Sequence, residues 1–256
     1  MDRNVQSGVA TTERVVQALF DAIESRDLRR IAAMLSVDCT WQNVPHEPTN
    51  GRDAVVAMFA SIVCPSDRVR WSIISAAHGD GVAWIERTDS FLIDDDEHNV
   101  RCNGVFLVDT NTELVTGVRD YVDLAEWRDR IDEILRRGVE RSAVDVVQRH
   151  LAAVARQDPL GMAADYAIDA VLIRGEDRRT GWASIADYFD TIPIRMSGRA
   201  LVFDNVITTE PGCVEVSWTM SSNSQSAEMI ASGTDDYVVT AGRIVRQTVT
   251  LATPDF

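Results

Sequence analysis

Three charged residues in the first half of the chain have the types and spacing that acid–base chemistry requires. Arg87 and Asp89 lie two positions apart in residues 82–93, where apolar and polar side chains alternate. This alternation predicts a β-strand and places both residues on the same face as Ile85 and Phe91. Asp120 lies in a second predicted strand, residues 118–123. Because a buried charge is tolerated only when it is paired, we predict a carboxylate–guanidinium–carboxylate cluster in an apolar pocket.

A cluster of this kind has two possible roles. It could carry out acid–base catalysis, or it could be a buried ion triad that only sets the register of the strands. The periodicity of the sequence supports the two interpretations equally.

Hydrophobic periodicity and turn signals predict the helices and strands around these residues. After a frayed tail, residues 1–10, Thr11 and Thr12 can cap a first helix with apolar residues at helical spacing. Asp27 begins a second helix, and the prolines and glycine of residues 45–51 indicate a loop. The remaining predicted elements are a strand at 39–44, a helix at 53–63, strands at 69–76, 82–93, 100–108 and 114–122, and a helix at 124–135 that ends near Gly138.

The same order of elements begins again after this helix. Matching segments such as Val15–Gln17 and Val146–Gln148 recur at offsets of 129 to 131 residues. A constant offset over several elements indicates duplication. We therefore predict two α+β domains, residues 1–137 and 138–256, joined around residues 136–140. In each, helices packed on a curved mixed sheet leave a conical pocket suited to a small molecule.

Composition and charge exclude several classes of function. The 256 residues carry a formal net charge of −15, with 40 acidic and 25 basic side chains. No basic stripe is available to neutralise phosphates, so neither nucleic acid nor an anionic membrane is expected as a partner. No signal peptide or membrane-spanning run is visible, and four scattered cysteines indicate reduced thiols, so a cytoplasmic protein is expected. Four dispersed histidines argue against a metal site.

The motifs of the first half together resemble those of the limonene-1,2-epoxide hydrolase family, within the NTF2-like or SnoaL-like superfamily of cone-shaped α+β (cystatin-like) barrels. The second half resembles only the superfamily. The matching segments are residues 41–45, 51–55, 86–89, 104–106 and 116–123.

The resemblance implies one-step opening of a small or medium apolar epoxide by water, without metal or cofactor. In that scheme Asp120 is the general base, Asn43 holds the water, Asp89 is the general acid and Arg87 bridges the two acids. Elementary electrostatics supports these roles, because two neighbouring acids share one proton and the cation between them keeps one ionised. General acid–base assistance of this kind contributes about 10²–10⁴-fold.

One residue departs from the family pattern. Trp41 stands where the family has a tyrosine, and an indole N–H donates a hydrogen bond but cannot accept one. We expect Trp41 to contact substrate and to be able to donate to the water. The change leaves open an epoxide-opening cyclase or isomerase of secondary metabolism, in which a hydroxyl of the substrate attacks. A third hypothesis is a non-catalytic ligand-binding or scaffold protein.

The second half lacks the cluster at the corresponding positions. Trp218 replaces Arg87, Met220 replaces Asp89, Val249 replaces Asp120 and Arg174 replaces Asn43. We expect this domain to be a non-catalytic structural partner that forms an internal pseudo-dimer, with a homodimer also possible. The alternative is a second ligand pocket lined by Trp218, Met220, Asp169 and Arg174.

Overall fold

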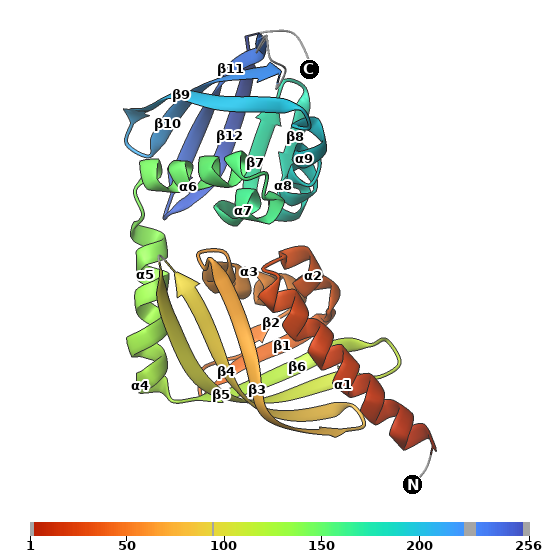
Figure 1. Cartoon of the computed structure of the whole chain (residues 1–256). Coiled ribbons are helices and arrows are strands. Elements are labelled where there is room, and N and C mark those ends of the chain that lie inside the picture. Colours follow the sequence, from red (N-terminus) through yellow and green to blue (C-terminus); the bar gives the residue numbers. More distant parts are fainter. Residues whose placement is uncertain (1–2, 94, 223–228, 253–256) are drawn as a thin grey trace. The chain divides into compact units, whose positions relative to one another are not determined.

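The computed structural model describes residues 3–93, 95–222 and 229–252 and divides the chain into two compact units, residues 1–136 and 137–256 (Figure 1). The boundary expected from the sequence was 137/138. In the described residues, no helix is both long enough and apolar enough to cross a membrane.

The first unit packs helices onto one mixed sheet. The sheet order is β2-β1-β6-β5-β4-β3, in which β1 and β6 are parallel and the other neighbours are antiparallel. The elements are α1 (Arg3–Glu24), α2 (Leu28–Ala33), β1 (Leu35–Val44), β2 (Thr49–Asn50), α3 (Arg52–Val63), β3 (Arg68–Gly79), β4 (Val82–Ile93), β5 (Asp96–Asp109), β6 (Leu114–Val122), α4 (Leu124–Trp127), a π-helical segment (Arg128–Asp132) and α5 (Glu133–Glu140), which crosses the unit boundary.

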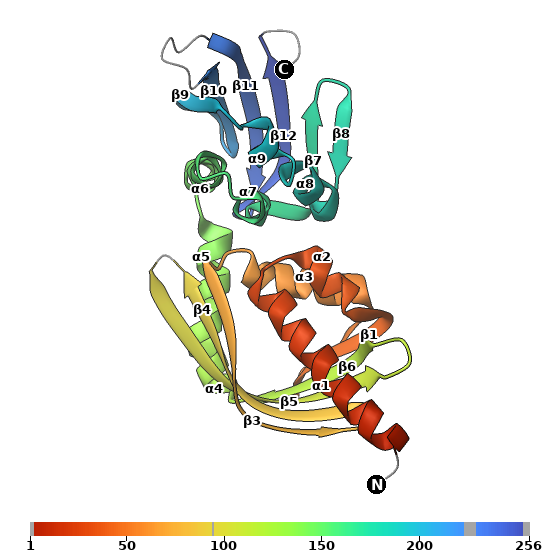
Figure 2. The ribbon, with the colours of Figure 1, turned by 45° about the vertical axis from the view of Figure 1, so that its right-hand side comes forward.

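The core of this unit lies between α1 and the concave face of the sheet, which curves around the helix in Figure 2. The helix buries an apolar stripe of Val15, Val16, Leu19, Phe20 and Ile23. Burying each such side chain contributes about 1.5–3 kcal/mol. These side chains therefore form part of an apolar core against the sheet.

The second unit repeats this arrangement. Its sheet order is β8-β7-β12-β11-β10-β9, and β7 and β12 form the parallel pair. The predicted α+β class, with helices on a mixed sheet in each half, is confirmed. The elements are α6 (Ala143–Ala155), α7 (Pro159–Ala164), β7 (Tyr166–Arg174), β8 (Asp177–Thr180), α8 (Trp182–Phe189), α9 (Ile192–Arg195), β9 (Arg199–Glu210), β10 (Cys213–Ser222), β11 (Met229–Thr240) and β12 (Arg243–Leu251).

The prediction of a frayed tail was wrong, because α1 begins at Arg3. Thr12 lies within the helix and does not cap it. Its hydroxyl donates to the Gly8 carbonyl at 2.9 Å and accepts from the Gly81 backbone N–H at 2.9 Å. A tertiary contact to the β3–β4 turn therefore uses the side chain that the sequence assigned to a local cap.

The last helix of the first half, which was expected to end near Gly138, includes this glycine and ends at Glu140. A glycine in a helix costs about 1 kcal/mol relative to alanine, which tertiary packing can outweigh. Gly138 is buried, and its carbonyl lies directly against Gly242. The residues expected to form a linker are therefore helical.

Candidate active site

The three charged residues come from two strands that are not neighbours in the sheet. Arg87 and Asp89 lie on β4 and Asp120 lies on β6, with β5 between them. The burial of β4 alternates along the strand, as its sequence predicts, so Ile85, Arg87 and Asp89 all point into the core. Their burial therefore follows from the period of the strand.

A glycine on the intervening strand allows the side chains to meet across it. Gly104 on β5 pairs with Ile85 on one side and with Asp120 on the other. A Cβ atom at Gly104 would lie 2.5 Å from Arg87 Nη1 and 2.8 Å from Asp120 Oδ1. The missing side chain is what lets the guanidinium reach over β5.

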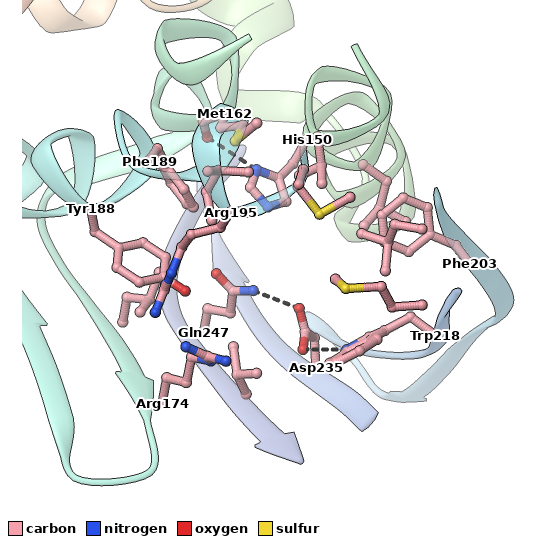
Figure 3. A pocket seen from close by; sticks show the side chains of 18 of the residues that line it. His150, Met162, Arg174, Tyr188, Phe189, Arg195, Phe203, Trp218, Asp235 and Gln247 are labelled. Carbon is pink, nitrogen blue, oxygen red and sulfur yellow. Dashed lines mark hydrogen bonds between the residues drawn. The ribbon is translucent and has the colours of Figure 1, made fainter. Parts of the chain in front are cut away.

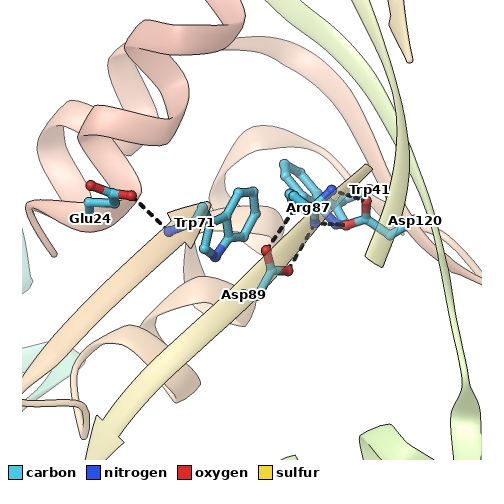
Figure 4. Close-up of polar contacts among 6 residues, drawn as sticks. All are labelled: Glu24, Trp41, Trp71, Arg87, Asp89 and Asp120. Atoms are coloured by element: carbon cyan, nitrogen blue, oxygen red, sulfur yellow. Dashed lines mark hydrogen bonds and ion pairs between the residues drawn. The ribbon is translucent and has the colours of Figure 1, made fainter. Parts of the chain in front are cut away.

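The guanidinium of Arg87 binds both carboxylates in a forked geometry (Figure 4). Its Nε donates to Asp89 Oδ1 at 2.8 Å and its Nη2 to Asp89 Oδ2 at 3.1 Å. On the other side, Nη1 donates to Asp120 Oδ1 at 2.9 Å and Nη2 to Asp120 Oδ2 at 3.0 Å. The predicted cluster is thus present in the first unit.

The cluster is removed from solvent and enclosed by aromatic rings. Arg87 is 1% exposed, and Asp89 and Asp120 are each 3% exposed. The Arg87 guanidinium carbon lies 4.1 Å from the centroid of the Trp71 ring and 5.5 Å from that of Phe106. A desolvated cation–π contact contributes about 2 kcal/mol, which partly offsets the cost of burying the cation.

The buried environment shifts the pKa values of Asp89 and Arg87. Burial raises the pKa of Asp89 to about 6, against the opposing effect of the Arg87 cation, and the Asp120 charge adds to the rise. Although burial disfavours a cation, the Asp120 and Asp89 charges raise the pKa of Arg87 well above its usual value. Arg87 therefore stays charged, and Asp89 can hold a proton near neutral pH.

A cavity of about 240 Å³ opens against the cluster, and Asp89, Asp120, Trp41 and Asn43 contribute to its wall. Asn43 faces Asp120 in the register of β1 and β6. In the described part of the chain, no hydrogen bond from the Asn43 side chain is present, so its amide is available to a ligand. The other lining residues are mostly apolar, including Ile23, Phe59, Ile62, Phe91 and Val122.

Trp41 contacts the cluster directly. Its indole Nε1 donates to Asp120 Oδ2 at 3.1 Å (Figure 4). This donor was expected to be able to bind a water, but it is engaged by the carboxylate. The ring itself lines the cavity and packs edge-on against Phe59, with centroids 4.8 Å apart.

Trp71 is a site residue that the sequence did not reveal. It lines the same cavity, and its indole Nε1 is buried without a hydrogen-bond partner. An unpaired buried donor costs about 1–3 kcal/mol, so it is suited to bind an acceptor on a ligand. Trp71 pairs directly with Asp89 across β3 and β4. The register shift between Ile73 and Ser75 produces this pairing, and counting back from the hairpin turn would have placed Ser72 there.

In the second unit, the strand registers show that the cluster is replaced. Val249 pairs with Arg174, as Asp120 pairs with Asn43 in the first unit. Trp218, Met220 and Arg174 line a cavity of this unit, as one of our alternatives expected. Asp169 was wrongly included, because its outward position on β7 leaves it exposed.

Comparison with known families supports the fold of the first unit. Residues 16–117, which lie in the first unit, match the model of the SnoaL-like domain family. The more specific resemblance to limonene-1,2-epoxide hydrolases stays a prediction.

Several solved structures are similar to part of this chain at low sequence identity. A putative SnoaL-like polyketide cyclase from Shewanella denitrificans OS-217 is 10% identical, with a TM-score of 0.43 over 48% of this chain and 97% of its own. An LEH-like epoxide hydrolase of M. tuberculosis is 23% identical, with a TM-score of 0.40 over 52% of this chain and 92% of its own. PrhC from Penicillium brasilianum NBRC 6234 is 12% identical, with a TM-score of 0.44 over 48% of this chain and 86% of its own.

Proposed function

We propose that the first unit is a cofactor-independent epoxide hydrolase that opens a small or medium apolar epoxide with water to give a diol. The observation that carries the proposal is the Arg87 fork, which holds Asp89 and Asp120 on the wall of one apolar cavity. Two acids with one guanidinium between them supply the acid and the base that epoxide opening needs.

In the proposed step, Asp120 removes a proton from a water while the water oxygen attacks an epoxide carbon. The C–O bond to that carbon breaks, and Asp89 transfers its proton to the departing oxygen. The products are the diol, a protonated Asp120 and an ionised Asp89, and one proton must return from Asp120 to Asp89 before the next cycle. The Arg87 guanidinium donates to both carboxylates, so it can stabilise whichever of the two is ionised while the other holds the shared proton.

The pKa of Asp89, raised by burial to about 6, supports its role as the acid. A carboxyl group with an unperturbed pKa near 4 would be ionised at neutral pH and could not donate. Trp71 pairs with Asp89 in the sheet and its buried Nε1 has no partner, which supports a role for this N–H in donating a second hydrogen bond to the epoxide oxygen. The pairing of Asn43 with Asp120 supports a role for the Asn43 amide in orienting the water.

A second candidate function is cyclisation of a hydroxy-epoxide, in which a hydroxyl of the substrate replaces water. The observation that favours it is the hydrogen bond from Trp41 to Asp120, which removes one donor that could have held a water. Asp120 would then deprotonate the substrate hydroxyl, and the product would be a cyclic ether.

The test is turnover of styrene oxide and of a matched hydroxy-epoxide in ¹⁸O-labelled water. We expect labelled diol from the wild type and a loss of at least about 10²-fold in Asp89→Asn and Asp120→Asn. Glu86→Gln is the matched control, because Glu86 lies on the same strand but bonds Arg101 on the outer face.

The outcomes separate the alternatives. Unlabelled cyclic ether without diol supports the cyclase. If both Asn variants remain folded and retain wild-type turnover, or if no epoxide reacts, the cluster is a structural ion triad and the proposal is wrong.

A further inference from the structure

The second unit contains its own cavity, of about 100 Å³, with one apolar side and one polar side. Figure 3 shows Phe203 and Trp218 on one side and Tyr188, Arg195 and Arg174 on the other. Asp235 and Gln247 lie between the two sides. All residues that line this cavity belong to the second unit, so a ligand bound there is independent of the function proposed for the first unit.

The acid of this cavity comes from a different strand than the acids of the first unit. Asp235 on β11 pairs with Val216 and with Val249. The residue with the same pairing in the first unit is Gly104, which lies between Ile85 and Asp120. The second unit therefore has Val249 where the first unit has Asp120, and it has Asp235 on the neighbouring strand where the first unit has Gly104.

Three side chains hold the Asp235 carboxylate. Trp218 Nε1 donates to Oδ1 at 2.9 Å, Gln247 Nε2 donates to Oδ2 at 2.7 Å and the Tyr237 hydroxyl donates to Oδ2 at 3.1 Å. Tyr166 in turn donates to Gln247 Oε1 and fixes the orientation of the amide. Oδ2 thus has two donors and Oδ1 has one, which leaves Oδ1 able to accept a further hydrogen bond.

Asp235 differs from Asp89 and Asp120 because no cation neutralises it. It is 9% exposed, and the ion pairs of the described residues include none to Asp235. Burial raises the pKa of Asp235 to about 6, which its three donors oppose. Burying a carboxylate without a counter-charge is costly, and donation of a further hydrogen bond to it lowers that cost.

The polar side of the cavity offers donors rather than acceptors. The Arg195 guanidinium lies 5.6 Å from the centroid of the Tyr188 ring, and no ion pair to it occurs in the described residues. A ligand that reaches both ends therefore needs an O–H for Asp235 and an acceptor or electron-rich group for Arg195. The packed rings and methionines between them favour a flat, apolar body.

We propose that the second unit is a separate binding site for a small, mostly apolar molecule with an acidic hydroxyl, a phenol or an enol, whose O–H donates to Asp235 Oδ1. Trp218 contacts the ring of this ligand, and Arg195 binds its opposite, electron-rich end.

The test uses the full chain and two probes of nearly equal shape. 4-Nitrophenol presents a hydroxyl, and 4-nitroanisole carries a methyl ether that cannot donate. A hydrogen bond to a charged group contributes about 1.5–3 kcal/mol, so we expect 4-nitrophenol to bind about 10–100-fold more tightly in equilibrium dialysis. Asp235→Asn should abolish this preference. Asp236→Asn should preserve it, because Asp236 is the adjacent acid and points outward into solvent.

Two further variants locate the site and guard against misfolding. Leu201→Trp should reduce the affinity for both probes by filling the apolar side of the cavity without touching Asp235, and far-UV circular dichroism checks that each variant is folded. Asp120→Asn, in the first unit, should leave both affinities unchanged. Equal affinity for the two probes, an unaltered preference in Asp235→Asn, or a preference that disappears in Asp120→Asn would each overturn the proposal.

Discussion

Replacing Arg87 with methionine should destabilise the first unit strongly, and more so at higher pH. Arg87 donates four hydrogen bonds of 2.8 to 3.1 Å to two carboxylates that are each 3% exposed. Without the cation, both acids remain buried and face each other. Removing one partner from a buried ion pair typically costs about 3–5 kcal/mol, which is a large part of the 5–15 kcal/mol that stabilises a typical domain.

The sign of the pH dependence follows from proton linkage. In Arg87→Met, desolvation and mutual repulsion raise the pKa of the two carboxyl groups in the folded state above their values in the unfolded chain. The folded state then binds more protons, so its stability is greatest at low pH and falls as the pH rises through the raised pKa values. The loss of unfolding free energy relative to wild type should grow as the pH rises. It should grow by about 1.4 kcal/mol per pH unit wherever the folded variant holds one more proton than the folded wild type.

Urea-induced unfolding, followed by tryptophan fluorescence at about pH 5 and pH 7.5, measures this effect. Arg101→Met is the matched control, because Arg101 pairs with Glu86 on the solvent face of the same strand pair. It should leave the midpoint unchanged. The triple variant Arg87→Met, Asp89→Leu, Asp120→Asn removes both charges, keeps an acceptor for the Trp41 indole, and should recover most of the stability.

The proposal of a buried acid pair that depends on the Arg87 cation would be contradicted if Arg87→Met lowered the free energy of unfolding by less than about 1 kcal/mol, or by the same amount at both pH values. The triple variant also separates stability from activity. If the cluster is catalytic, the triple variant should fold but open no epoxide. If the triad is purely structural, the triple variant should turn over epoxide at the wild-type rate.

Three further predictions concern the same site. Because the proton of Asp89 is lost with a pKa of about 6, kcat/KM for epoxide opening should fall tenfold per pH unit above that value; a flat profile to about pH 8 would exclude Asp89 as the acid. Trp71→Phe keeps the ring but removes the unpaired indole donor, and kcat should fall about 10–100-fold; an unchanged kcat would show that Trp71 does not bind the leaving oxygen. Gly104→Ala places a methyl group 2.5 Å from Arg87 Nη1, and thermal unfolding should report a loss of about 1–3 kcal/mol; an unchanged Tm would mean that β5 has room for a side chain there.

Much of the first site could be read from the chain alone, because it depends on local periodicity. Arg87 and Asp89 share a buried face through the two-residue period of β4, and their alternation with polar residues is visible in the sequence. The repeated order of elements likewise predicted the α+β class, since duplication preserves the spacing of helices and strands. The roles assigned to these residues stay predictions.

Other parts of the two sites depend on how the strands pair. Trp71 meets Asp89 only because β3 shifts its register between Ile73 and Ser75. Gly104 matters only because Arg87 and Asp120 lie on either side of β5 and must meet across it. Neither relation can be counted from sequence spacing, because a bulge of one residue costs little locally but changes every later pairing.

Asp235 shows the same limit most clearly. Comparing the two halves position by position finds every acid of the first site replaced, and it passes over an acid that stands where the first half has Gly104. Periodicity along the chain was enough to predict which side chains face inward and how the elements repeat, because these are properties of neighbouring residues. Which inward-facing groups touch could be seen only in the folded protein, because hydrogen bonds depend on distances between strands that lie far apart in the chain.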